Sequence, residues 1–295
     1  MHGLVRLHLK ARTYIILIVL VMIPLVAVCA PMPRILAYFK STDMFHPVGE
    51  NVLIEADEDI AFGAQIQSVV PQYLDSIQNK IGLDFTRDAK VFVCHSIESF
   101  CDHTGSKSPG PRASVLRKFF VSPRLQGTED WSSIVYHELV HVLLMQNLSM
   151  YRYLTTPIWF HEGLATMVAN GGGSGNVDDS TAVANILAGK HFCPVDKEKF
   201  LFPQSFENPD IGIWVHYRQA MLFVAFMKNS DADAFDRLLH DLVSDRNFRE
   251  AVRNAYQTDI AALWKNFVGD LQVQSEQRIY PEDSRIAGDA KIYYE

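Results

Sequence analysis

Basic residues and cysteines are both scarce in this sequence. The 295-residue chain has 27 Lys and Arg against 34 Asp and Glu, and its net charge is −7 at pH 7. No segment gathers the cationic side chains that binding to nucleic-acid phosphates requires, so we expect no nucleic-acid partner. The four cysteines include no C-x-x-C pair, which argues against a zinc site built from cysteines. A repeat of fixed period is also lacking, which argues against a solenoid or a propeller.

Hydrophobic residues make up 48% of the chain and charged residues 21%, values typical of a folded globular protein. Strand patterns come early and helix patterns late, an order that predicts an α+β fold: a small N-terminal β-sheet with helices, followed by a mainly helical C-terminal lobe. The expected strands are 51–56, 90–95 and 113–122, and the expected helices are 59–81, 131–147, 157–169, 180–190, 212–229, 232–243, 246–256 and 258–272. Pro71 is expected to bend the first of these helices, and the glycine run at 171–175 to end the third and to be mobile.

One long uncharged run lies near the N-terminus. Residues 13–30 contain no charged side chain, and Arg6, Lys10 and Arg12 precede them. A run of 18 residues is near the lower limit for a membrane-spanning helix, and the basic flank predicts a cytoplasmic N-terminus with the rest of the chain on the far side of the membrane. A cleaved signal peptide, giving a secreted or periplasmic protein, is the alternative. Pro31 directly after the possible cleavage site favours a retained anchor.

The chain is therefore expected to have four parts: the anchor or signal segment at 1–30, a proline-containing linker at 31–50, one folded domain at 51–275, and a loosely held tail at 276–295. Within the domain, Cys94 and Cys101 are the nearest pair of cysteines. They permit a disulfide in an oxidising compartment, and two buried free thiols are the alternative.

The stretch SSIVYHELVHVLL at 132–144 combines an apolar helix pattern with three chemically active side chains. His137 and His141 are four residues apart, so on a helix they lie one turn apart on the same face. Two imidazoles so placed can bind one zinc ion, and Glu138 lies beside them, close enough to act on a water at that ion. Two core histidines on an apolar helix are the alternative explanation if this motif stands alone.

A second His-Glu pair follows in PIWFHEGLA at 157–165. Catalytic zinc usually takes three protein ligands and leaves a fourth position for water. Either Glu162 or His161 offers the third ligand, and only one of them can face the metal because neighbours on a helix point about a quarter turn apart. Gly163 is expected to let this helix pack closely against the helix that carries His137.

These two segments together, HELVH and WFHEGLA, resemble the gluzincin zinc metallopeptidases, in particular the peptidase-MA-like family. The resemblance covers residues 90–230 and implies a zincin-like fold, a metallopeptidase-like catalytic domain at 51–275, and a peptide or protein substrate. It implies that His137, His141 and Glu162 are zinc ligands and that Glu138 is the general base.

A further part of the resemblance lies in IWVHYRQAMLFVAFM at 213–227. Relatives carry a tyrosine in a similar helix that assists the reaction, and Tyr217 is the residue that aligns with it. A phenol that donates a hydrogen bond to the oxyanion suits this chemistry. His216 is an alternative donor, and ordinary helix packing is an alternative role for Tyr217.

Two departures from the family pattern bear on the expected support of the zinc ligands and on the expected type of peptidase. Relatives often carry a carboxylate that orients a zinc-bound histidine, four residues after the glutamate ligand; here that position is Thr166, so a hydroxyl or a group from elsewhere must serve. The strand segment 113–122 lacks the glutamate by which aminopeptidases hold a free amine, and carries Arg117 and Lys118 instead. We therefore expect an endopeptidase rather than an aminopeptidase. A non-catalytic, zinc-stabilised membrane scaffold or chaperone-like protein is the alternative.

Overall fold

The computed structural model describes residues 37, 39–106, 112–115, 118–196 and 210–279. Several expected features lie outside these residues. They are the N-terminal membrane or signal segment, the linker residues 31–36 and 38, Arg117, and most of the C-terminal tail. Within them, no helix is both long and apolar enough to cross a membrane.

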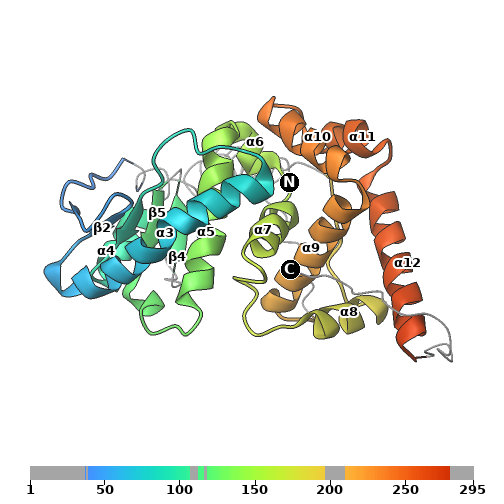
Figure 1. Ribbon diagram of the computed structural model, residues 1–295, viewed down its shortest axis with the longest axis horizontal. Coiled ribbons are helices and arrows are strands. Elements are labelled where there is room, and N and C mark those ends of the chain that lie inside the picture. Colours follow the sequence, from blue (N-terminus) through green and yellow to red (C-terminus); the bar gives the residue numbers. More distant parts are fainter. Residues whose placement is uncertain (1–36, 38, 107–111, 116–117, 197–209, 280–295) are drawn as a thin grey trace, which may run out of the picture.

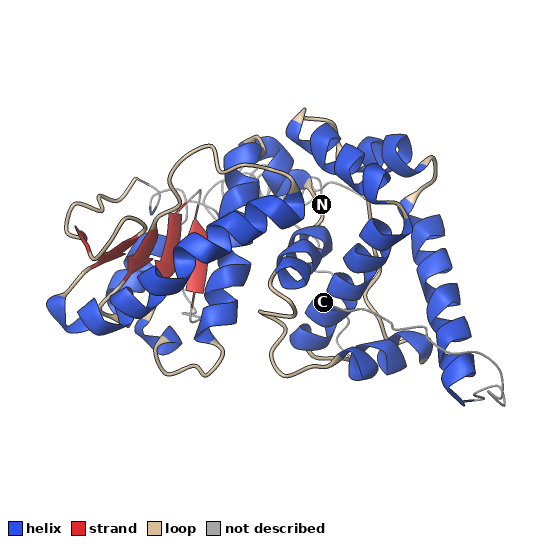
Figure 2. Ribbon diagram, in the orientation of Figure 1, coloured by secondary structure: helices blue, strands red, loops and turns tan. Residues whose placement is uncertain are grey.

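The described part of the chain has the α+β organisation expected from the sequence, with a small sheet at one end and helices over the rest (Figure 2). The strands are β1 (His46–Pro47), β2 (Val52–Ile54), β3 (Val91–Val93), β4 (Arg112–Val115) and β5 (Lys118–Val121). The α-helices are α3 (Ile60–Ile81), α4 (Ile97–Thr104), α5 (Trp131–Asn147), α6 (Met150–Thr155), α7 (Ile158–Val168), α8 (Asp179–Leu187), α9 (Ile213–Ser230), α10 (Ala232–Val243), α11 (Phe248–Tyr256) and α12 (Ile260–Ile279), and short 3-10 turns occupy Asp57–Asp59 and Pro123–Leu125.

The sheet has the strand order β1-β2-β3-β5-β4, with β2, β3 and β5 parallel and the two outer strands antiparallel to their neighbours. Side chains alternate between its faces. Val91 and Val93 of β3 belong to the main core with α3 and α5, whereas Phe92 and its register partner Phe120 join a smaller core with Phe100 of α4 on the opposite face. The sheet is therefore buried on both sides.

The prediction of one strand over 113–122 is wrong. That segment contributes two strands, β4 and β5, which pair antiparallel with Arg112 opposite Val121 and Val115 opposite Lys118. Arg112, one residue before the expected start, already belongs to β4. Because the chain reverses inside the segment, β4 lies at the edge of the sheet and β5 lies in its interior.

Most expected helices are confirmed within one or two residues, and α8 ends at Leu187, three residues before its expected end. Helix α3 continues unbroken through Pro71. Helices α4 and α6 were not expected, and α12 runs to Ile279, past the expected start of the tail at 276. Cys94 and Cys101 are free thiols, so no disulfide joins them.

Helix α5 lies between the sheet lobe and the helical lobe formed by α7 to α12 (Figure 1). Every residue of α5 from Ile134 to Gln146 is buried. An apolar helix with no polar face is stable only when neighbours cover it all round, and α3, β4, β5 and α7 supply that cover. The two histidines of α5 are therefore held inside the protein at the junction of the two lobes.

Candidate metal centre

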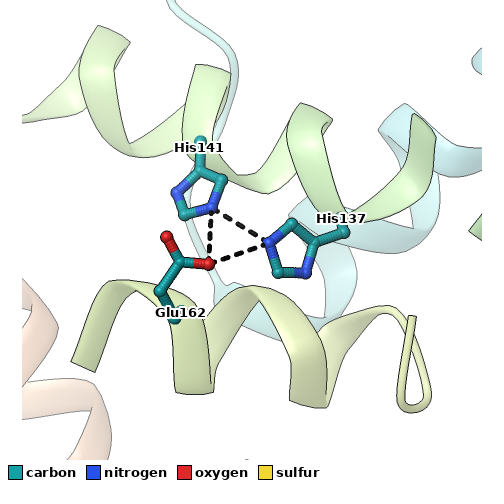
Figure 3. Close-up of side chains that lie close together, drawn as sticks. All are labelled: His137, His141 and Glu162. Carbon is teal, nitrogen blue, oxygen red and sulfur yellow. Dashed lines mark hydrogen bonds and ion pairs between the residues drawn. The ribbon is translucent and has the colours of Figure 1, made fainter. Parts of the chain in front are cut away.

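His137, His141 and Glu162 meet at the contact between α5 and α7 (Figure 3). The His137 Nε2 and His141 Nε2 atoms are 3.1 Å apart. Glu162 Oε2 lies 3.2 Å from His137 Nε2 and 3.6 Å from His141 Nε2. Two ligands about 2.0–2.1 Å from a tetrahedral zinc ion lie about 3.4 Å apart, so the three atoms are spaced as such an ion requires.

The hydrogen bonding of His137 shows why a cation suits this point. Its Nδ1–H donates to the Gly172 carbonyl oxygen at 2.9 Å, which leaves Nε2 to face Glu162 as an acceptor when the ring is neutral. The carboxylate oxygen of Glu162 is also an acceptor. Two acceptors at 3.2 Å repel each other unless a proton or a metal cation lies between them. A buried group of these three residues could therefore hold a metal ion.

The electrostatics keep Glu162 ionised. Burial raises the pKa of its carboxyl group, but the neighbouring His141 and His137 outweigh burial and hold the pKa well below its ordinary value. Its side chain is 18% exposed, whereas those of His137 and His141 are 0% and 7% exposed. Glu162 is therefore the most exposed of the three side chains.

Among the described residues, no fourth His, Cys, Asp or Glu joins this group. His161, the alternative third ligand, is buried with its ring packed edge-on against Tyr153, at a centroid distance of 4.6 Å. Burial lowers the pKa of His161 to about 3, so the ring is neutral at physiological pH. The structure thus brings Glu162, and not His161, together with the two histidines of α5.

Glu138, the candidate general base, is buried on α5 at 6% exposure. Tyr153 of the unexpected helix α6 lies close to both candidate carboxylates: burial raises the pKa of its phenol, and the charges of Glu162 and Glu138 raise it further. Tyr153 therefore stays protonated and able to donate a hydrogen bond. Tyr153 was not predictable from the sequence, because its short helix carries no apolar period.

Tyr217 of α9 lies beside the metal group. Its ring is nearly parallel to that of His137, at an interplanar angle of 10° and a centroid distance of 6.3 Å. Trp214 packs edge-on against Tyr217, at a centroid distance of 5.9 Å, and is 47% exposed. His216, the alternative donor, is fully buried.

The glycine run at 171–175 (the glycine loop) supplies the group that orients His137. It ends α7, as expected, but Gly172, Gly173 and Ser174 are buried. Thr166, where relatives often carry a carboxylate, has its hydroxyl 3.5 Å from His137 Nδ1, whereas the Gly172 carbonyl is at 2.9 Å. A main-chain oxygen therefore fixes the orientation of this histidine.

The expected role of Gly163 needs correction. A Cβ atom added at Gly163 would lie 2.6 Å from the Ala220 carbonyl oxygen and 2.9 Å from Val224 Cγ2, and both residues belong to α9. The close approach that Gly163 permits is therefore between α7 and α9, not between α7 and α5. Sequence spacing indicated a crowded helix contact but not which helix supplies it.

Comparisons of this chain with protein-family models and with curated proteins give no match.

Proposed function

We propose that this protein is a zinc-dependent peptidase of the gluzincin type, an endopeptidase rather than an aminopeptidase. The observation that carries the proposal is the convergence of His137 Nε2, His141 Nε2 and Glu162 Oε2 at 3.1–3.6 Å with no fourth ligand among the described residues. Structural zinc sites usually have four protein ligands, whereas catalytic sites leave one position for water. The zincin-like fold belongs to the same proposal, supported by a small sheet that packs on the helix carrying the two histidines.

The chain's own residues supply the acid–base steps. Bound zinc provides Lewis acidity toward a water molecule and toward the scissile carbonyl. Glu138 takes a proton from the attacking water and passes it to the leaving amine, a transfer that suits a buried carboxylate next to His137. Tyr217 donates a hydrogen bond to the oxyanion that develops on the carbonyl. His137, His141 and Glu162 hold the ion.

The edge strand β4 suits an extended peptide. Among the described residues it pairs with β5 on one side and with no strand on the other, and it contacts α5, which carries His137 and His141. An unpaired strand edge can accept a peptide as an additional strand through main-chain hydrogen bonds. The substrate would then run past the metal centre in an extended conformation.

The proposal also places the protein at a membrane, with residues 13–30 as a retained anchor and the catalytic domain outside the cytoplasm, on the sequence grounds given above. Fractionation of cells that express the full-length chain, followed by protease treatment of intact cells, checks this placement. Recovery of the protein as a shortened form in the soluble extracytoplasmic fraction would instead support a cleaved signal peptide.

The decisive experiment is digestion of a peptide library by the full-length protein, with and without a zinc chelator, beside the Glu138→Gln variant. We expect cleavage that the chelator abolishes and that zinc restores, with internal rather than terminal bonds cut. Glu138→Gln should bind zinc and lose turnover. Zinc binding without any cleavage by the wild type would favour the non-catalytic scaffold, and full activity of Glu138→Gln would refute the general-base role.

A further inference from the structure

The glycine loop is confined by contacts on its inner side, toward the metal centre. An added Cβ atom at Gly173 would lie 2.5 Å from His137 Nδ1, and one at Gly172 would lie 2.6 Å from the Ser133 carbonyl oxygen of α5. Gly171, Gly173 and Gly175 have φ values of +92°, +88° and +58°, a region that side-chain-bearing residues rarely adopt. Only glycine can bring a main-chain carbonyl this close to the His137 ring.

The outer side of the loop is covered by Arg218 of α9. An added Cβ atom at Gly171 would collide with Arg218 Nη1, so the guanidinium group lies directly against the loop. Arg218 Nε also donates to Asp179 Oδ1 at 2.6 Å. Asp179 is the first residue of α8, which follows the loop in the chain. One arginine therefore contacts the loop at its start and the segment just beyond its end.

The burial of this pair is unequal. The Arg218 side chain is 19% exposed and the Asp179 side chain 57% exposed. An exposed ion pair contributes little to global stability, so the pair is a poor candidate for a general stabilising role. Locally, the pair restricts the glycine loop, because the Asp179 carboxylate holds the planar Arg218 guanidinium over Gly171.

We propose that the Arg218–Asp179 pair is a latch that presses the glycine loop against His137, and that Arg218 is a positioning residue for metal binding. The inference rests on the zinc site proposed above. With the latch in place, the Gly172 carbonyl accepts the Nδ1–H of His137 and keeps Nε2 available for the metal. Without it, the loop moves away and His137 can carry its proton on Nε2, where the proton blocks the metal.

The test is a zinc-affinity measurement on the full-length protein by competition with a chromophoric chelator. Loss of a group that orients a metal ligand typically lowers affinity by about 10–100-fold. We expect Arg218→Ala to lower zinc affinity by about 10-fold, at the lower end of that range because the carbonyl itself remains. Asp179→Ala should have a similar effect, and the double variant should be no worse than either, since both changes open the same latch.

A spectroscopic readout separates positioning from general destabilisation. In the metal-free wild type, long-range ¹H–¹⁵N spectra should show His137 with its proton on Nδ1, and Arg218→Ala should show a mixture of both tautomers. The control is Arg246→Ala, which removes another partly exposed arginine–aspartate pair, Arg246 Nε to Asp241 Oδ2 at 3.1 Å, at the end of α10 and outside the glycine loop. This control should change neither zinc affinity nor the tautomer.

The outcomes distinguish the latch from the zinc site itself. If His137→Ala loses zinc while Arg218→Ala and Asp179→Ala bind it like the wild type, the latch is refuted and the zinc site stands. If His137→Ala binds zinc like the wild type, the zinc site fails and the latch with it. Should Arg218→Ala not fold, Asp179→Ala alone decides, because that side chain lies at the surface.

Discussion

Gly163 of α7 lies against the main chain of Ala220 in α9, so that a single methyl group would meet the Ala220 carbonyl oxygen at 2.6 Å. Because the obstacle is backbone in a tightly packed helix pair, one of the helices would have to shift. Glu162, which immediately precedes Gly163, would move with α7. The contact thus links the packing of the helical lobe to the position of a candidate metal ligand.

We expect Gly163→Ala to lower the free energy of unfolding by about 1–2 kcal/mol, because overpacking costs about 1–3 kcal/mol and the gain in helix propensity returns up to about 1 kcal/mol. Zinc affinity should fall as well. Gly269→Ala in α12 is the control, since nothing lies within 4 Å of an added Cβ atom there, and it should stabilise the protein slightly. Chemical denaturation measures the free energy of unfolding of both variants. Equal effects of the two substitutions on that free energy would contradict the packing argument.

Zinc should raise the stability of the wild-type protein through selective binding to the folded state. At a free zinc concentration about 100 times the Kd, the gain is about 2.7 kcal/mol. His137→Ala, His141→Ala and Glu162→Ala should each remove this gain, because each deletes one of three ligands. Thermal unfolding with and without zinc measures the difference. A wild type that zinc leaves unchanged would exclude the site, and a variant that keeps the full gain would exclude that ligand.

Gly173→Ala should damage the metal centre more than the fold. Its matched control is Gly189→Ala, which follows α8 at φ +73° with nothing within 4 Å of the added Cβ atom. Both substitutions place alanine at positive φ and should cost about 1 kcal/mol. Only Gly173→Ala puts a methyl group against His137, so only it should lower zinc affinity, by about 10-fold or more. Equal zinc affinities of the two variants would be incompatible with the glycine loop as the support of His137.

Tyr217→Phe should lower kcat by about 100-fold, the lower end of the range for losing one oxyanion donor, and leave zinc affinity unchanged. The ring remains parallel to His137 in this variant, so packing is preserved and only the hydroxyl is lost. Steady-state kinetics on a cleaved peptide measures the effect. An unchanged kcat would show that the Tyr217 hydroxyl is not the oxyanion donor, and would leave His216 and Tyr153 as the candidates.

His103 should make the fold sensitive to acid. Its ring is 1% exposed, stacks on Phe120, and has no hydrogen-bond partner for either nitrogen within the part of the chain that the structure describes. Burial first, and then the charge of Lys40, lowers its pKa below the ordinary 6.5, while Glu55 and Asp102 oppose this shift and Lys118 adds to it. The unfolded chain takes up a proton as pH falls through 6.5 and the folded chain does not, so stability falls below that pH.

The variant His103→Phe removes the titrating imidazole, together with its two buried nitrogens that have no hydrogen-bond partner among the described residues. We expect it to be about 1 kcal/mol more stable at pH 7, and to lose less stability between pH 6.5 and 5. The difference in slope should approach, at most, about 1.4 kcal/mol per pH unit, the value for one proton. Denaturant unfolding at several pH values measures both quantities. A variant with the wild-type pH slope would show that His103 is protonated equally in both states.

The sequence was sufficient for the long helices and for the three residues that form the metal group. Helix α5 was identifiable because apolar residues dominate the segment from Ile134 to Met145, and the two histidines fall one turn apart within it. The distance along the chain allowed a second helix to pack back on the first, but it did not separate Glu162 from His161, and only the resemblance to the gluzincins favoured Glu162. These features depend on local periodicity, which a single sequence carries.

What the sequence did not indicate depends on contacts between distant parts of the chain. Helix α6 has only six residues and is held by the Ser149 cap and by Arg152, which donates to the Asp245 carbonyl oxygen 93 residues away. The glycine loop contained the usual signal of a helix end, yet its contacts with His137 and Arg218 join three separate elements. No periodicity predicts such contacts, because each partner follows a different local rule.

The Gly172 carbonyl also has a consequence for how this protein can change during evolution. A carboxylate that supports a histidine is lost when its own codon changes, whereas this main-chain oxygen is lost when the path of the backbone changes, as a side chain at the neighbouring glycines would force. The support for His137 is inherited as the shape of a turn, so insertion or deletion of one residue between Val168 and Asp179 should be as harmful as loss of a ligand.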